Sequence, residues 1–303
     1  MTPYLSDEWF ARWKTALDEA EKIDMNVWIY DENSYPSGFA GGFVPEALPD
    51  SRGMGLKFEE VETLDQLDKN IWYVFCPQEN RQNDNIAYKN ITAESKTAGK
   101  LEPLPNGQKY LLGKIHYAPQ NGWFGGKWYI DLLKKGVTEK FFEITLDAYK
   151  NVPEIQKEFG KRVPGIFTDE PYPAGATVGT YVTWNDEIPE LFEKRFGYSL
   201  IDHLPSLSKN ISDWKKIRHN YHQLILDLFI ERWAKPYFER CEKYGLEFTG
   251  HYCENRWSKT ANCPVYMAMH VWRQRPAIDL LTNNYNDQSP VSVHGVYVAK
   301  FEN

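Results

Sequence analysis

The chain has 303 residues, a formal net charge of −7 and 42% hydrophobic residues. This length can bury a large core in one or two domains. Acidic and basic residues are mixed along the chain, so we expect no nucleic-acid partner and no binding to an anionic membrane. No apolar run is long enough to cross a membrane, and the first residues, Met1-Thr2-Pro3-Tyr4, do not resemble a signal peptide. The localisation therefore stays open.

The cysteines do not predict a metal site or a disulfide scaffold. There are four of them, Cys76, Cys241, Cys253 and Cys263, and they lack metal-type pairing. His251, Cys253 and Cys263 could in principle hold zinc, but no Cys-x-x-Cys motif supports a metal there, and incidental thiols are the better interpretation. We expect no cofactor.

Aromatic residues are frequent, at 15% of the chain. Several of them lie in polar, glycine-rich loops, as Trp123 does within residues 121–129. Aromatic rings beside Asn and Gly suit hydroxylated ligands such as sugars. We predict that Trp123 contacts a carbohydrate substrate.

The first predicted elements are a helix over residues 7–23, with Ser6 as its N-cap, and a strand over 25–30. This strand ends in Asp31 and Glu32. The loop that follows contains several glycines, which allow the backbone to approach a ligand closely. The two carboxylates either brace this loop through backbone N–H groups or bind a sugar, and the sequence favours neither role.

Residues 57–105 differ from their surroundings, because strand-like runs alternate there with polar residues that lack helical periodicity. We predict a β-rich insertion over this range. A strand over 109–117 is then expected to rejoin the main sheet and to bring His116 to the substrate.

The most buried predicted strand, residues 163–168, ends abruptly at Asp169 and Glu170. Pro171 cannot continue the strand, so the two carboxylates lie where it becomes a loop. The alternative is a surface Asp-Glu pair in a turn, which does not explain the apolar strand before it.

Two later strands also end in polar residues. The strand over 246–250 leads into His251 and Glu254, and the strand over 277–281 leads to Asn283. Between Glu170 and these strands we predict a long amphipathic helix that Pro236 should kink. His251 is either a structural histidine or a ligand of sugar hydroxyls.

Strands and helices that alternate, with polar residues at the strand ends, predict an α/β fold of the TIM-type (β/α)8 barrel class. We count five barrel strands where a closed barrel needs eight, so residues 1–303 are expected to form an incomplete catalytic barrel with the insertion at 57–105. A doubly wound sheet is the competing fold, but no Gly-x-Gly-x-x-Gly motif or phosphate loop favours it.

Carboxylates that converge on one rim suit the cleavage of a glycosidic bond, where one carboxylic acid protonates the departing oxygen and a second carboxylate activates water or attacks the sugar. Glu170 is the better proton donor, since it ends the most buried strand. Asp169 would orient Glu170 or a substrate hydroxyl. If the second catalytic carboxylate lies within the chain, Glu254 is the first choice.

Several blocks of the sequence resemble the large bacterial α-L-rhamnosidases of glycoside hydrolase family 106. The blocks occur in the same order as in that family, at residues 2–9, 28–32, 35–42, 165–171, 250–254 and 278–281.

The resemblance implies the inverting hydrolysis of terminal rhamnose from a plant glycan, within a longer secreted or periplasmic protein that has β-sandwich domains. It implies that Glu170 corresponds to the general acid and that the partner carboxylate lies on a later strand, beyond Asn303. Calcium is associated with such enzymes, although no run of ligands in this sequence identifies a site.

Two alternatives stay open. Carboxylates at strand ends do not specify the sugar, so an exo-glycosidase such as a β-galactosidase-type barrel is possible. A non-catalytic glycan-binding remnant, or an inactive fragment of such an enzyme, is the alternative from a different class. In each case the expected partner is an oligosaccharide or polysaccharide.

Overall fold

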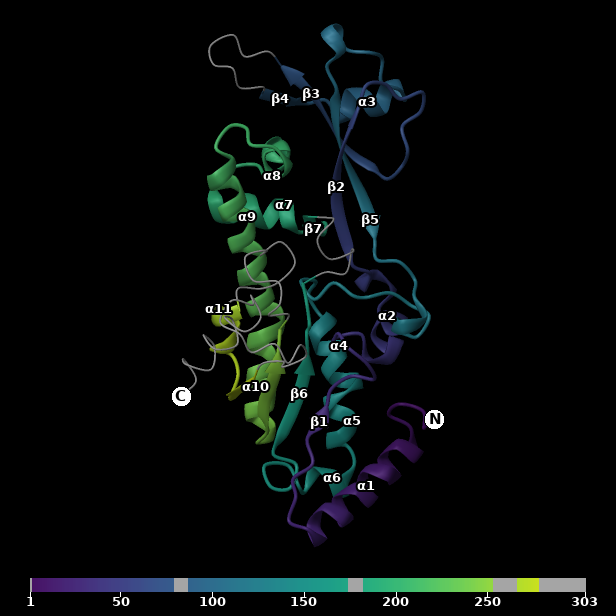
Figure 1. The fold of residues 1–303 in the computed structure, drawn as a ribbon, viewed down its shortest axis with the longest axis vertical. Helices are drawn as coiled ribbons and strands as arrows, with labels where there is room; N and C mark the ends of the chain where they lie inside the picture. Colours follow the sequence, from purple (N-terminus) through teal and green to yellow (C-terminus); the bar gives the residue numbers. More distant parts are fainter. Residues whose placement is uncertain (1, 79–86, 174–181, 253–265, 278–303) are drawn as a thin grey trace, which may run out of the picture. The chain divides into compact units, whose positions relative to one another are not determined.

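The computed structural model describes residues 2–78, 87–173, 182–252 and 266–277. The chain forms two compact units (Figure 1). The first contains residues 1–52, 119–174 and 226–303, and the second contains residues 53–118 and 175–225. Within the described ranges, no helix combines the length and the apolar character that a membrane span requires.

The first unit contains a parallel sheet with the strand order β1-β6-β8-β9. Its strands are β1 (Ile29–Tyr30), β6 (Gly165–Asp169), β8 (Glu247–His251) and β9 (Arg275–Pro276). Its helices are α1 (Asp7–Lys22), α2 (Phe43–Ala47), α4 (Val137–Ile144), α5 (Leu146–Lys150), α6 (Pro153–Gln156), α10 (Lys235–Tyr244) and α11 (Tyr266–His270).

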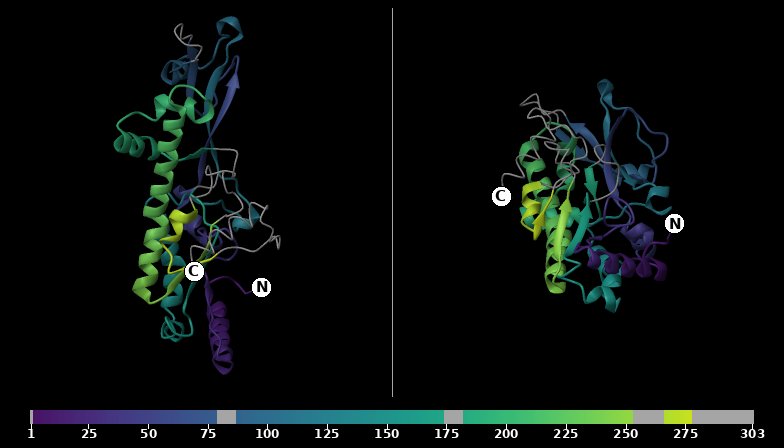
Figure 2. Two further views of the ribbon diagram at one scale, coloured as in Figure 1. Left: turned by 60° about the vertical axis from the view of Figure 1, so that its left-hand side comes forward. Right: turned by 60° about the horizontal axis from the view of Figure 1, so that its bottom comes forward.

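Burial of aromatic rings holds the helices of the first unit on its sheet. Helix α10 packs against β8 (Figures 1 and 2), where the rings of Tyr237 and Phe248 stack with their centroids 4.1 Å apart. Phe142 of α4 meets the same tyrosine edge-to-face at 4.9 Å. Contacts of this kind add to the stabilisation that burial of the rings supplies.

The predicted start of the first helix is confirmed. The Ser6 side chain accepts a hydrogen bond from the Trp9 backbone N–H, and Asp7 and Glu8 occupy the first turn. A cap of this kind satisfies one of the N–H groups that a helix leaves unpaired at its start.

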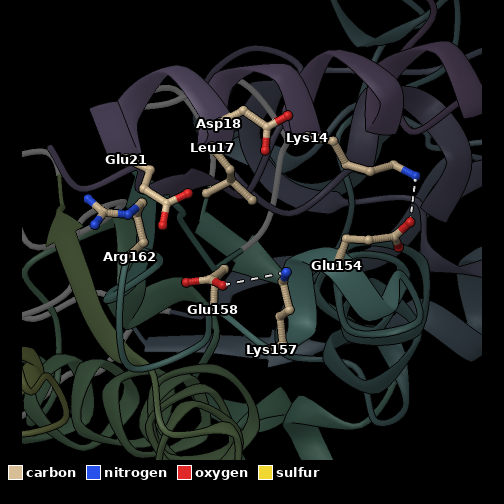
Figure 3. A pocket seen from close by; sticks show the side chains of 8 residues that line it. All are labelled: Lys14, Leu17, Asp18, Glu21, Glu154, Lys157, Glu158 and Arg162. Carbon is tan, nitrogen blue, oxygen red and sulfur yellow. Dashed lines mark hydrogen bonds and ion pairs between the residues drawn. The ribbon is translucent and has the colours of Figure 1, made fainter. Parts of the chain in front are cut away.

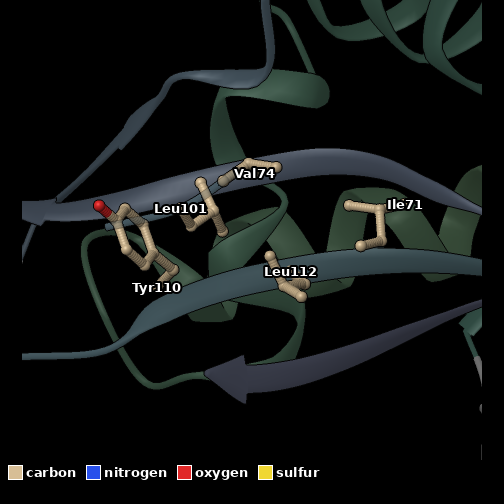
Figure 4. Packing of buried hydrophobic residues seen from close by; sticks show 5 residues of the cluster. All are labelled: Ile71, Val74, Leu101, Tyr110 and Leu112. Atoms are coloured by element: carbon tan, nitrogen blue, oxygen red, sulfur yellow. The ribbon is translucent and has the colours of Figure 1, made fainter. Parts of the chain in front are cut away.

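The second unit is built on an antiparallel sheet with the strand order β4-β3-β5-β2-β7. Its strands are β2 (Met54–Val61), β3 (Ile71–Gln78), β4 (Ala87–Asn90), β5 (Tyr110–Tyr117) and β7 (Val182–Trp184), and its helices are α3 (Thr92–Ala98), α7 (Ile188–Phe196) and α8 (Pro205–Ser208). Its core contains Ile71, Val74, Leu101, Tyr110 and Leu112 (Figure 4).

The predicted strand over 109–117 exists as β5, but its expected place in the parallel sheet is wrong. β5 pairs antiparallel with β2 and β3. The second unit accordingly takes in residues 53–118 and 175–225, a larger part of the chain than the β-rich insertion expected at 57–105. The assignment of the remaining residues to an incomplete barrel stays a prediction.

The long helix that the sequence predicts is divided into two. α9 (Trp214–Phe229) is followed by a π-helical turn, η6 (Ile230–Ala234), and then by α10. The irregular turn thus precedes Pro236, which lies in the first turn of α10. Proline is tolerated there because the first N–H groups of a helix have no partner within it.

In the described ranges of the chain, the fold is therefore a mixed α/β arrangement of one parallel and one antiparallel sheet. The predicted strand over 277–281 falls outside the described residues, except for residue 277. A TIM-type barrel stays a prediction.

Candidate functional site

Four side chains gather at the carboxyl ends of β1, β6 and β8: Tyr30, Asp169, Glu170 and His251. Neighbouring parallel strands bring their carboxyl ends to the same edge of a sheet, and Asp169 pairs with His251 in the β6–β8 register. We call these four residues the strand-end cluster. It unites three of the residues that the sequence predicted with one, Tyr30, that it did not.

Asp169 is the centre of the strand-end cluster. Its Oδ2 atom accepts a hydrogen bond of 2.7 Å from the Tyr30 hydroxyl, and its Oδ1 atom lies 3.0 Å from His251 Nε2. On the other side of the imidazole, His251 Nδ1 lies 4.0 Å from Glu170 Oε1. The four side chains therefore form one continuous polar row across three strands.

The two carboxylates of this row remain accessible to solvent. The side chains of Asp169 and Glu170 are 22% and 21% exposed, whereas that of His251 is 7% exposed. A ligand at the strand ends would thus meet the carboxyl groups more readily than the imidazole.

The backbone at Glu170 is held in an unusual conformation. Its φ of 44° lies in the left-handed region, which costs a residue with a side chain about 1 kcal/mol. The Glu170 N–H donates to the His251 carbonyl oxygen at 3.1 Å. Strain of this kind persists only where surrounding contacts impose it, and it concentrates at functional positions.

Hydrogen bonds keep Asp169 ionised. Burial raises the pKa of its carboxyl group, but the hydrogen bonds from His251 and Tyr30, together with the electrostatic attraction of His251, outweigh burial and leave the pKa below its ordinary value. Burial, together with the bond to Asp169, raises the pKa of the Tyr30 hydroxyl, which therefore stays a hydrogen-bond donor.

Asp31, for which loop bracing and sugar binding were the two expected roles, is fully buried. Its carboxylate accepts hydrogen bonds from the hydroxyls of Ser37, at 2.5 Å, and Tyr237, at 2.9 Å. Ser37 Oγ in turn accepts the Asp169 N–H at 2.7 Å. Asp31 therefore acts on the strand-end cluster through the loop, and it is not offered to a ligand.

Glu32 has the bracing role that was the alternative to sugar binding. It is 2% exposed, and its two oxygens accept backbone N–H groups of the following loop, from residues 33, 38, 40 and 41. The side chain thus closes the loop that follows β1. Like Asp31, it is not available to a substrate.

These two carboxyl groups predict an unusual dependence of stability on pH. Burial raises the pKa of Asp31 to about 7 and that of Glu32 to about 8, from ordinary values of 3.8 and 4.5, although hydrogen bonds oppose the shift. Between the ordinary and the raised pKa values, the folded chain binds more protons than the unfolded chain. The free energy of unfolding therefore falls as pH rises through this range. Asp169, whose pKa is lowered from 3.8, acts in the opposite sense at still lower pH.

Urea denaturation at about pH 5 and about pH 8 measures this effect, with the lower stability expected at the higher pH. Asp31→Asn, which cannot ionise, should reduce the slope between the two conditions. A wild-type chain that gains stability over this interval would contradict the burial of both groups in their observed places.

His116 lies on β5 in the antiparallel unit, so the reasoning that placed it at the end of a parallel strand is wrong. Burial, with Lys57 and Lys114 nearby, lowers the pKa of its imidazole. The remaining predicted residues, Glu254 and Asn283, lie outside the described residues, as do Cys253 and Cys263.

Trp123 lies in an exposed aromatic pair with Tyr35. The side chains are 52% and 50% exposed, meet edge-to-face at 5.6 Å, and are joined by a 2.5 Å hydrogen bond from Trp123 Nε1 to the Tyr35 carbonyl oxygen. Tyr35 lies two residues before Ser37, whose N–H donates to the Asp169 carbonyl oxygen at 2.7 Å. The pair is therefore anchored beside the strand-end cluster.

A separate pocket lies between α1 and α6 (Figure 3). It is lined by Lys14, Leu17, Asp18, Glu21, Glu154, Lys157, Glu158 and Arg162. Arg162 precedes the first residue of β6, so this pocket belongs to the end of the strand opposite Glu170. Its charges are mixed and include a 3.0 Å ion pair between Lys14 and Glu154. It offers no group poised for chemistry.

Sequence reasoning missed Tyr30 and Ser37. Both are adjacent to predicted features, since Tyr30 directly precedes Asp31 and Ser37 lies in the glycine-containing loop. Only the parallel pairing of β1 with β6 brings them to Asp169. In the described part of the chain, no group of three or more His, Cys, Asp or Glu side chains could hold a metal ion.

The sequence matches no protein-family model and no curated protein. Among solved structures, the chain is similar to a rhamnosidase from Novosphingobium sp. PP1Y, with 17% sequence identity and a TM-score of 0.43. The match covers 62% of this chain and 19% of the rhamnosidase chain.

Proposed function

We propose that the chain contributes the acid-bearing part of a glycoside hydrolase site, in which Glu170 protonates the oxygen of the departing group. The observation that carries the proposal is the strand-end cluster: a partly exposed glutamate, held by a strained backbone, beside an aspartate and a histidine. A carboxylic acid within hydrogen-bond reach of the leaving oxygen is the group that this reaction requires.

The other residues have supporting roles. Asp169 stays ionised and orients the His251 imidazole, and the Tyr30 hydroxyl orients the Asp169 carboxylate through a hydrogen bond. Glu254 is proposed as the second carboxylate, which activates water in an inverting reaction. Acid and base are then both carboxyl groups, so the proposed reaction needs no cofactor.

The proposed substrate is an oligosaccharide or polysaccharide that ends in α-L-rhamnose. The sequence blocks that resemble α-L-rhamnosidases suggest this sugar. Assays with aryl α-L-rhamnoside and aryl β-galactoside test the choice, since a rhamnosidase should release the aryl group from the first and leave the second intact. Preference for the galactoside would favour the alternative exo-glycosidase.

The exposed pair of Tyr35 and Trp123 is proposed to stack on a sugar ring of the substrate. Aromatic–sugar stacking combines apolar contact with the ring face and solvent access for the hydroxyls. We expect Trp123→Ala to weaken oligosaccharide binding about tenfold, roughly the effect of losing one well-packed ring. Isothermal titration calorimetry measures this loss.

Met25→Ala is the matched control, because Met25 is also exposed, at 56%, but precedes β1 at the opposite end of the sheet. Binding should be unchanged in this variant. Equal affinity of Trp123→Ala and the wild type would exclude the aromatic pair from the binding surface.

Non-catalytic glycan binding is the second candidate, and the same exposed pair favours it because stacking needs no second carboxylate. Hydrolysis separates the two candidates. A binding remnant would take up oligosaccharide without releasing sugar, and Glu170→Gln would leave its affinity nearly unchanged.

A further inference from the structure

Each of the two nitrogen atoms of the His251 imidazole faces a protein carboxylate. Nε2 faces Asp169 at 3.0 Å and Nδ1 faces Glu170 at 4.0 Å. The side chain is 7% exposed, and its ring lies 5.8 Å from that of Phe167. This placement differs from that expected of a residue that binds sugar hydroxyls.

Asp169 determines which nitrogen of His251 carries the hydrogen. An ionised carboxylate only accepts hydrogen bonds, so Nε2 must be the donor in the 3.0 Å contact. In the neutral ring Nδ1 is then unprotonated, and its lone pair faces Glu170. The Tyr30 hydroxyl and the Ser37 side chain hold Asp169 in the orientation that imposes this tautomer.

We propose that His251 is a positioning residue for Glu170, kept in the Nε2–H tautomer by Asp169 and Tyr30. The inference rests on the proposed function of Glu170 as the proton donor. The Nδ1 lone pair would accept the hydrogen bond of the protonated Glu170 carboxyl group and so keep that group near the departing oxygen, to which the carboxyl O–H turns for the proton transfer. The 4.0 Å separation exceeds a hydrogen bond, but contacts of this kind are often long in free enzymes and shorten when substrate binds.

The same arrangement accommodates Glu170 after it has lost its proton. The proton passes from the Glu170 carboxyl group to the leaving oxygen, and the carboxylate remains. A solvent proton bound at Nδ1 would then place an imidazolium between two carboxylates, which stabilises the ionised glutamate. Transfer of that proton to Glu170 restores the acid for the next turnover.

Nitrogen-15 NMR of the histidine-labelled chain tests the tautomer without any need for activity. The His251 signal is identified by its loss in His251→Asn. We expect Nε2–H in the wild type and a change to Nδ1–H in Asp169→Asn. In that variant the Tyr30 hydroxyl donates to the amide oxygen, so the amide NH₂ group faces His251 Nε2. Because the NH₂ group needs an acceptor, Nε2 must be unprotonated and the hydrogen moves to Nδ1. Nδ1–H in the wild type, or no change in Asp169→Asn, would overturn the proposal.

Steady-state kinetics test the positioning role of His251. We expect His251→Asn and His251→Gln to lower kcat for an alkyl rhamnoside about tenfold to a hundredfold while KM changes less than about threefold. His219→Asn, a substitution of an exposed histidine in α9, should leave both constants unchanged. Circular dichroism checks that each variant is folded.

Two kinetic outcomes count against different claims. A raised KM with unchanged kcat would make His251 a sugar ligand and overturn the proposed positioning role. Absence of hydrolysis by the wild type would contradict the proposed function instead, and the NMR experiment would still decide whether Asp169 sets the His251 tautomer.

Discussion

Glu170→Gln is expected to lower the hydrolysis rate of an alkyl rhamnoside by about 10²–10⁴-fold, the usual contribution of a general acid. Glutamine keeps the size and the strained backbone position of Glu170 but has no acidic proton that can be transferred to the leaving oxygen. An aryl rhamnoside carries a leaving group that departs without protonation, so its rate should fall much less. The measurement is kcat/KM for the two substrates in both proteins.

Glu158→Gln is the matched control, because Glu158 lies in the pocket between α1 and α6 (Figure 3). Its kinetics should equal those of the wild type. Equal losses for alkyl and aryl substrates in Glu170→Gln would show that the residue binds or orients the sugar and does not protonate the leaving group.

Gly250→Ala is expected to give the largest loss of stability. Gly250 lies in β8 with φ +123°, and an added Cβ would lie 1.9 Å from the Thr168 carbonyl oxygen of β6. Because backbone occupies that space, the clash cannot be relieved by a change of rotamer. We expect the free energy of unfolding to fall by at least about 3 kcal/mol, as measured by urea denaturation.

Gly126→Ala controls for conformation alone. Gly126 also has a positive φ, +77°, but a Cβ there would meet nothing within 4 Å. The free energy of unfolding of Gly126→Ala should fall by about 1 kcal/mol, the cost of a left-handed residue without a clash. Similar losses for the two variants would contradict the close approach of β8 to β6.

Local patterns were sufficient to predict the elements that carry the strand-end cluster. The apolar run of 165–167 followed by two carboxylates and Pro171 predicted the end of β6, and the strand leading into His251 was also predicted. These features depend on residues close together in the sequence. The N-cap of α1 at Ser6 was predictable for the same reason.

The pairing of strands was not predictable in the same way. β5 is buried along most of its length, and this pattern is also typical of a strand in a parallel sheet. Its antiparallel pairing with β2 and β3 is defined only by contacts between residues distant in sequence. His116 was therefore assigned to the wrong kind of strand end.

The different roles of the four carboxylates could not be predicted from the sequence either. Asp31-Glu32 and Asp169-Glu170 each follow a strand, so the two pairs look equivalent there. In the structure the two pairs differ. Asp31 and Glu32 are buried and accept hydrogen bonds from hydroxyls and backbone N–H groups, whereas Asp169 and Glu170 remain accessible to solvent.

The most direct test of the proposed function is the release of free rhamnose from an aryl α-L-rhamnoside by the folded wild-type chain, measured by chromatography with Glu170→Gln in parallel. We expect the wild type to release rhamnose, and we expect hydrolysis of the alkyl rhamnoside, assayed in the same way, to depend more strongly on Glu170. Release no faster than in the buffer blank, by a chain shown to be folded, would contradict the proposed function.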